Sequence, residues 1–155
     1  MNSTVFRRIV ELLDRHAVPY QVLHHAPVFT SQQAAQVRGT TLGSGAKALV
    51  CKADDQFLMF VLPADLRLDS KRIRRDQGVR DLRFGTPQEV QELTGLTAGA
   101  IPPLGSLFAL PTWCDERLGQ QSTINFNAGD HAISISISYD DYVKVERPKL
   151  GAFAR

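Results

Sequence analysis

The sequence lacks the features that define several large protein classes. It has only two cysteines, Cys51 and Cys114, which lie far apart and form no CxxC pair, so neither a disulfide framework nor a zinc site is indicated. No apolar run approaches the roughly 20 residues that span a bilayer. The Rossmann motif GxGxxG, the P-loop and the serine-hydrolase motif GxSxG are also absent. These absences favour buried thiols, and they give no support to a membrane protein, a dinucleotide-binding fold or a serine hydrolase.

The composition is that of a globular protein with a real core. Of the 155 residues, 43% are hydrophobic and 22% are charged, and the formal net charge is only +2. A chain of this length suits one domain over residues 1–155. The N-terminal segment carries charges every few residues and has no apolar signal-peptide region, which favours a cytoplasmic protein. The net charge alone does not identify a nucleic-acid partner.

Hydrophobic periodicity and capping residues predict an α/β (α+β) fold. Apolar spacing and caps predict helices over residues 4–16, 30–39, 68–76 and 86–95. Strands are predicted over residues 20–25, 46–53, 56–63, 106–110, 122–129 and 131–139. Because strands outnumber helices and several follow one another directly, we expect a central mixed, largely antiparallel sheet flanked by helices.

Lys47 stands at the start of an otherwise apolar strand, shortly after Gly43 and Gly45. A lysine is rarely buried without a partner. One interpretation is a strand-end lysine whose ammonium reaches solvent. The other is a fixed cation in a cleft that holds a phosphate or polarises an ester carbonyl, with the two glycines leaving room for a ligand.

Two later segments can likewise be interpreted either as purely structural or as part of a functional site. "GAIPPLG" runs from Gly99 to Gly105 and is either a stiff connector or a rigid loop whose N–H groups cradle an oxyanion. "FNAGDH" contains Asn127, Gly129 and His131 and is either a hairpin turn or part of a site that works near neutral pH.

Other polar residues carry weaker signals. Lys71, Arg74 and Arg75 share one face of a predicted helix, which is either a solvated surface or a contact for an RNA backbone. His24 and His25 have no third ligand at metal-like spacing, so no metal site is predicted. Neither a triad nor a nucleophile elbow surrounds Ser31.

The order of these segments is more specific than any one of them. From Tyr20 to Tyr142 the chain carries "TSQQAA", "GAKALV", "LPADLRLDSKRIRR", "GAIPPLG" and "FNAGDH". In this order they resemble the YbaK/ProX family of aminoacyl-tRNA deacylases, free-standing relatives of the editing domain of bacterial prolyl-tRNA synthetases. The resemblance implies a compact domain without metal or organic cofactor that hydrolyses the ester of a mischarged tRNA.

The resemblance also implies roles for individual residues. Lys47, Gly99, Gly105, Asn127 and His131 match catalytic positions. The positions that match a substrate-binding role are Tyr20, Phe29, Gly45, Ile101, Pro102 and Gly129. We expect Lys47 to point at the 99–105 loop and to anchor the terminal phosphate or the ester region. Backbone N–H groups of the loop would face the reacting carbonyl. A ribose hydroxyl, or a water held by Asn127 or His131, would complete proton transfer.

The expected partner is the acceptor end of a mischarged tRNA, and an aminoacyl-tRNA synthetase is a possible second partner, whereas no DNA or membrane partner is expected. Polar side chains at Asn127 and His131 favour a Ser or Thr aminoacyl group, with Ala next and Cys possible. Two alternatives stay open: a non-catalytic RNA-binding or regulatory module, and a hydrolase of small esters. The salt dependence of tRNA binding would distinguish the second alternative.

Overall fold

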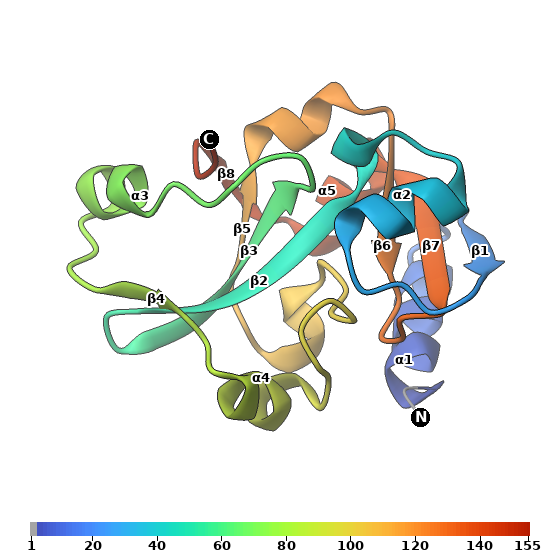
Figure 1. Cartoon of the computed structure of the whole chain (residues 1–155), viewed down its shortest axis with the longest axis horizontal. Helices are drawn as coiled ribbons and strands as arrows, with labels where there is room; N and C mark the ends of the chain where they lie inside the picture. Colours follow the sequence, from blue (N-terminus) through green and yellow to red (C-terminus); the bar gives the residue numbers. More distant parts are fainter. Residues whose placement is uncertain (1–2) are drawn as a thin grey trace.

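The computed structural model describes residues 3–155, which form five α-helices, three short 3₁₀ helices and eight strands (Figure 1). The helices are α1 (Ser3–Arg15), α2 (Ser31–Arg38), α3 (Ser70–Gln77), α4 (Pro87–Thr94) and α5 (Tyr139–Glu146), with η1 (Leu42–Ser44), η2 (Gly105–Phe108) and η3 (Glu116–Gln120). The strands are β1 (Gln21–His24), β2 (Ala46–Ala53), β3 (Gln56–Pro63), β4 (Leu82–Phe84), β5 (Thr112–Asp115), β6 (Thr123–Asn127), β7 (Ile133–Ser138) and β8 (Lys149–Gly151). Among the described residues, no helix is both long and apolar enough to cross a membrane.

The strands form two sheets rather than one central sheet. A three-stranded antiparallel sheet has the order β1-β7-β6, and a five-stranded mixed sheet has the order β4-β2-β3-β5-β8. In the larger sheet β2 pairs antiparallel with β3 and β4, while β3, β5 and β8 run parallel. The sheets touch at one parallel bridge between Gly45 and Asn125. The predicted fold class is thus confirmed, with the sheet divided at this bridge.

Local hydrogen bonds explain why the helix boundaries were predictable. Thr86 and Glu89 form a reciprocal capping box at the start of α4. Thr30 caps α2 by accepting a hydrogen bond from the N–H of Gln33, and Gly39 ends α2 in a left-handed conformation. Asp69 caps α3 in the same way as Thr30 caps α2. These boundaries agree with the predicted ones.

The strand predicted over residues 106–110 is wrong, because this segment is the 3₁₀ helix η2. The Glu146 carboxylate accepts hydrogen bonds from the N–H and the hydroxyl of Ser106, at 3.0 and 2.6 Å, and so holds the turn from a distant part of the chain. The left-handed φ of 56° at Ala109 then ends η2. The actual strand, β5, begins at Thr112.

Hydrophobic residues form one cluster on each face of the larger sheet. Side chains alternate between the two faces along β2 and β3, so Val50, Met59 and Val61 pack in the cluster that also contains residues of the smaller sheet and α1. Cys51 and Phe60 face the second cluster, which α3 and the C-terminal segment cover. Both faces of β3 are therefore covered, as its continuous apolar run predicted.

Candidate active site

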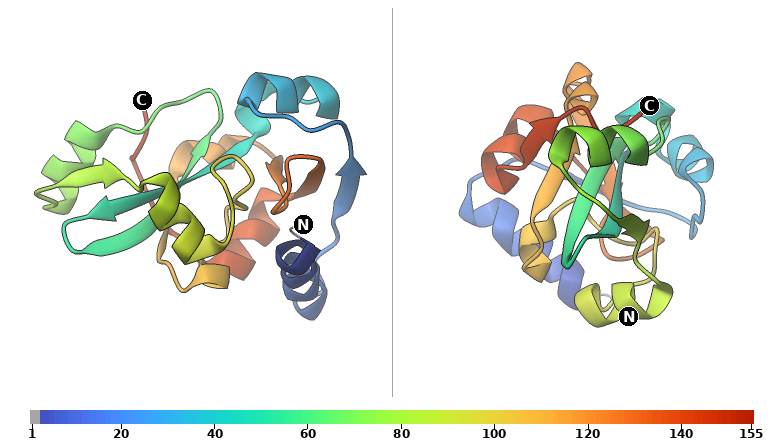
Figure 2. Two further views of the ribbon diagram at one scale, coloured as in Figure 1. Left: turned by 60° about the horizontal axis from the view of Figure 1, so that its bottom comes forward. Right: turned by 90° about the vertical axis from the view of Figure 1, so that its left-hand side faces the viewer.

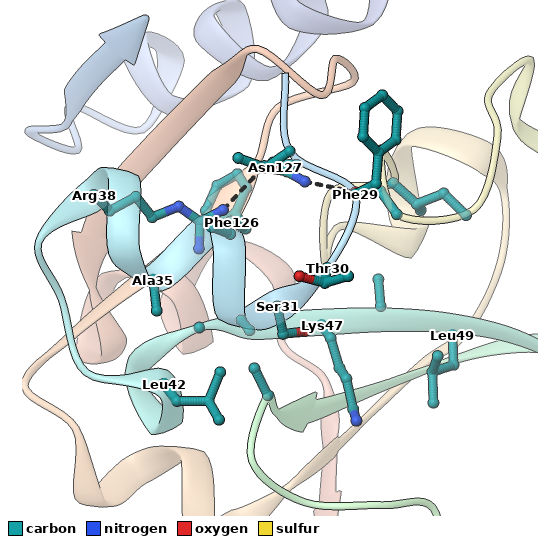
Figure 3. Close-up of a pocket in the computed structure, with 18 of the residues that line it drawn as sticks. Phe29, Thr30, Ser31, Ala35, Arg38, Leu42, Lys47, Leu49, Phe126 and Asn127 are labelled. Carbon is teal, nitrogen blue, oxygen red and sulfur yellow. Dashed lines mark hydrogen bonds between the residues drawn. The ribbon is translucent and has the colours of Figure 1, made fainter. Parts of the chain in front are cut away.

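A cavity opens where β2 and β6 separate beyond the Gly45–Asn125 bridge. It has a volume of about 190 Å³, and α2 covers it with Ala34, Ala35 and Arg38. Figure 3 shows α2 above the start of β2, with Asn127 at the end of β6 beside Arg38. The site thus lies at the junction between the two sheets.

The cavity brings together six of the eleven residues that the family resemblance matched to catalytic or substrate-binding positions. They are Phe29, Gly45, Lys47, Gly99, Ile101 and Asn127. The remaining five do not line it: Tyr20, Pro102, Gly105, Gly129 and His131. The six come from segments that are far apart in the chain, so the fold assembles a shared site from the separate motifs.

Lys47 lines the cavity, but its ammonium does not point at the 99–105 loop as predicted. Figure 3 shows the side chain extending away from Asn127 toward the segment that follows β3. Desolvation lowers the pKa of Lys47, nearby Arg67 lowers it further, and Asp65 acts in the opposite direction.

The physical reason for this orientation is the alternation of side chains along β2. Lys47 shares its face of the strand with Leu49 and Cys51, which pack in the cluster beneath α3. Ile101 and Leu104 of the loop belong to the cluster on the opposite face. Lys47 is half-buried, so its surroundings also differ from those of a lysine extended into bulk solvent.

The 99–105 loop offers fewer free N–H groups than predicted. The N–H of Gly105 is buried and donates to the hydroxyl of Thr112 at 3.1 Å. The N–H of Ala100 donates to the carbonyl of Thr97 at 3.2 Å. Gly99, in contrast, is exposed at the cavity with a φ of +91°. We therefore retain Gly99 as a site residue and assign Gly105 to the packing of the loop.

Asn127 is fixed by a hydrogen-bond network that includes Arg38, a residue that the sequence analysis missed. The Asn127 amide donates to the carbonyl of Gly99 at 2.7 Å, and its oxygen accepts from Nη2 of Arg38 at 2.9 Å. Nε of Arg38 also donates to the hydroxyl of Ser134 at 2.8 Å. Burial lowers the pKa of Arg38 to about 10, so the guanidinium remains charged at neutral pH.

His131 does not line the cavity but contacts Phe29, which does. Its ring nitrogens form hydrogen bonds with the carbonyl of Val28 and the hydroxyl of Thr97, at 3.0 and 3.1 Å. The imidazole packs against the Phe29 ring with a centroid distance of 4.8 Å. Phe29 is 72% exposed, so one face of a supported aromatic ring is open to solvent beside the cavity.

The edge of β2 is open at Ala48, which lines the cavity. Gly85 donates its N–H to the carbonyl of Val50, so even-numbered residues of β2 direct their backbone groups toward the β4 side. The paired part of β4 reaches only Cys51, whereas β6 meets β2 at Gly45. Between these contacts the N–H and C=O of Ala48 face the cavity.

The basic helix α3 lies at the other end of the molecule from α2 in two views (Figures 1 and 2). Lys71, Arg74 and Arg75 are exposed on it, and the hydrogen bond from Arg75 to Asp76 raises the pKa of Arg75. These three residues are separate from the cavity, and their contact with RNA stays a prediction. Residues 3–155 contain no group of three or more His, Cys, Asp or Glu side chains placed to bind a metal ion.

Comparison with known proteins gives one consistent result. Residues 25–145 match the family described as the aminoacyl-tRNA editing domain. The chain is 34% identical over 158 residues to the multifunctional Ser/Thr-tRNA deacylase ProXp-y of Escherichia coli (strain K12), covering 99% of this chain and 95% of that protein. A proline–tRNA ligase of Shouchella clausii is 27% identical over 132 residues, which cover 83% of this chain and 22% of the ligase.

A crystal structure described as a candidate trans-editing enzyme for prolyl-tRNA synthetase superimposes with a TM-score of 0.85 at 26% identity. The match covers 97% of both chains. The overall fold of this chain is therefore shared with that protein.

Proposed function

The chain belongs to the aminoacyl-tRNA editing domain family, and on that premise we propose that residues 1–155 act as one domain that hydrolyses the ester linking a wrongly attached amino acid to tRNA. The observation that carries the proposal is that Lys47, Gly99 and Asn127, which come from separate motifs, line the same cavity. A relative that is 34% identical along almost the whole chain is named a Ser/Thr-tRNA deacylase. We place the reaction in the cytoplasm, where tRNAs are charged.

The mechanism requires positioning and charge stabilisation rather than a strong nucleophile. Water adds to the acyl carbon, and the carbonyl π electrons move onto the acyl oxygen. When this electron pair returns, the bond to the ribose oxygen breaks and that oxygen takes the proton released by the water. The products are the tRNA hydroxyl and the free amino acid, so no covalent enzyme intermediate or cofactor is needed.

Different residues at the rim and in the interior of the cavity position the substrate and the attacking water. Half-buried Lys47 anchors the terminal phosphate at the rim, where Arg67 adds positive charge. The exposed ring of Phe29, supported by His131, offers a stacking surface for the terminal base. The second amide N–H of Asn127 has no partner among the described residues and can donate to the attacking water or to a substrate hydroxyl.

We propose Ser and Thr as the preferred aminoacyl groups, with Ala next. A cavity of about 190 Å³ holds a small aminoacyl group, and polar Asn127 at its wall favours a side chain with a hydroxyl. His131 no longer supports this preference, because both of its ring nitrogens already have protein partners. A preference for Cys-tRNA alone would contradict the assignment.

The test is release of free amino acid from a panel of tRNAs charged with Ser, Thr, Ala or Cys. We expect wild-type protein to release Ser and Thr and the Lys47→Ala variant to lose most of that activity. Lys52→Ala is the matched control, because Lys52 lies on the same strand outside the cavity and packs over Phe57. Wild-type rates in Lys47→Ala would refute the role of Lys47.

The same panel separates the two alternatives. A protein that binds charged tRNA but releases no amino acid is a binding module. A protein whose hydrolysis of small esters is insensitive to salt and unaffected by tRNA is a small-ester hydrolase. We expect tRNA deacylation at subsaturating tRNA to weaken as salt rises, because Lys and Arg contacts with phosphates release counterions. Loss of salt dependence in variants of Lys71, Arg74 and Arg75 would support a tRNA contact at α3.

A further inference from the structure

Arg38 is a half-buried cation without an acidic partner. It is the last residue of α2 and lines the cavity. None of the ion pairs formed among residues 3–155 includes it. Removing a charge from water is costly unless an opposite charge or several hydrogen bonds replace the solvent. An unpaired guanidinium in this position is therefore suited to an anionic group that enters the cavity.

Much of the hydrogen-bonding capacity of Arg38 is unused. Of the five N–H groups of a guanidinium, one on Nε binds Ser134 and one on Nη2 binds Asn127. The other three have no hydrogen-bond partner in the described part of the chain. Nη1 lies near Gly45, where an alanine Cβ would stand 3.7 Å from it. The free edge thus lies beside the start of β2, between the two strands that form the cavity.

The neutral partners of Arg38 are themselves fixed. Nδ1 of His25 donates to the carbonyl of Ala26 at 2.8 Å, and in the neutral ring its Nε2 then accepts from the hydroxyl of Ser134 at 2.8 Å. The lone pairs of Ser134 remain available for Nε of Arg38. On the other side, Asn127 is held by Gly99. The guanidinium is therefore oriented before any ligand enters, and the network does not neutralise its charge.

We propose that the free edge of Arg38 binds the acyl oxygen of the ester and stabilises the negative charge that develops there during hydrolysis. This inference rests on the deacylase function proposed above. Two of the loop N–H groups that could have taken this role, those of Ala100 and Gly105, already have partners. A cavity of about 190 Å³ has room for a small aminoacyl group, and Arg38 lies in its wall.

The proposed interaction belongs to the transition state. When water adds to the acyl carbon, the π pair moves to the oxygen, and this oxyanion receives N–H groups from Arg38. The pair then returns as the ribose oxygen leaves with a proton, and the same edge faces the carboxylate of the product. A donor that is oriented in advance toward developing charge lowers the barrier more than it tightens binding of the ground state.

The experiment compares Arg38→Gln with wild type in two measurements. The first is the single-turnover rate at saturating seryl-tRNA. The second is the Kd for a seryl-tRNA analogue whose 3′-amide linkage resists hydrolysis. We expect Arg38→Gln to lower the rate about 10²- to 10³-fold while Kd changes by less than about threefold. Arg38→Lys keeps the charge but not the planar arrangement of donors, so it should recover only part of the rate.

Two further variants keep the test decisive. Ser134→Ala leaves the guanidinium in place and removes its Nε contact, so an intermediate loss of rate is expected even if Arg38→Gln folds poorly. Arg80→Gln is the matched control, because Arg80 is exposed after α3 and away from the cavity. We expect Arg80→Gln to behave as wild type.

The outcomes separate this inference from the function on which it rests. If Arg38→Gln retains the wild-type rate at saturation, the inference is wrong. If Kd rises while the saturated rate is unchanged, Arg38 instead anchors a phosphate, which also overturns the inference. If wild-type protein releases no amino acid from any charged tRNA, it is the deacylase function that fails.

Discussion

Substituting alanine for Gly105 tests whether this residue belongs to the fold rather than to the site. An added Cβ would meet the hydroxyl of Thr112 and would stand 2.7 Å from the carbonyl oxygen of Leu110. Overpacking of this kind costs about 1–3 kcal/mol. Loss of the buried bond from the Gly105 N–H to Thr112 adds about 1 kcal/mol. The free energy of unfolding should therefore fall by about 2–4 kcal/mol, which lowers Tm by about 4–16 °C in a chain of this size.

Gly99→Ala is the matched comparison at the other end of the same loop. Gly99 is exposed with a φ of +91°, and an added Cβ would lie 3.3 Å from Cε1 of His131. The left-handed backbone costs an alanine about 1–2 kcal/mol, and the shift it causes falls directly on the cavity.

Chemical denaturation followed by circular dichroism measures stability, and deacylation per folded molecule measures the site. We expect Gly105→Ala to lose more stability and Gly99→Ala to lose more activity. A Gly105→Ala protein as stable as wild type but inactive would refute the assignment of Gly105 to packing.

Two predictions concern stability away from the cavity. The hydrogen bond from Arg83, followed by the backbone N–H of Thr86, lowers the pKa of Glu89 from 4.5 to about 2. The ionised Glu89 carboxylate should therefore contribute fully to stability above pH 4.5, and this contribution should be lost as pH falls toward 2. A difference in Tm between wild type and Glu89→Gln that does not change with pH would contradict this. The buried hydroxyl of Tyr142 donates to the carbonyl of Pro103 at 2.7 Å, so Tyr142→Phe should lower the free energy of unfolding by about 1–3 kcal/mol. A loss within the error of urea denaturation would show that this bond contributes little.

The elements that the sequence predicted well are those whose ends depend on nearby residues. Thr86 and Glu89 are three residues apart and cap each other, so α4 could be bounded without tertiary information. Helix η2 depends on Glu146, which lies 40 residues from Ser106. Local hydrophobicity therefore suggested a strand there. The helix α5 was missed although Ser138 caps it through the N–H of Asp141, a signal that the preceding strand pattern concealed.

The site shows the same division between local and distant information. Motif order identified six residues that line one cavity, but it gave no orientation for Lys47. Alternation along β2 contained that information, since Ala46 and Ala48 face one cluster and Leu49 the other. Arg38 was not recognisable, because an arginine in the last turn of a helix is common for local electrostatic reasons. Only its partners 89 and 96 residues away distinguish it.

The open edge at Ala48 has a consequence for how selectivity can change. Its N–H and C=O face the cavity whatever side chain occupies the position, since the backbone is common to all residues except proline. Replacements at Asn127 or along α2 can therefore alter which amino acid fits, while a main-chain hydrogen-bonding edge is preserved. In such a cavity, side-chain contacts can change by mutation, whereas the main-chain hydrogen bonds offered by Ala48 are rarely lost.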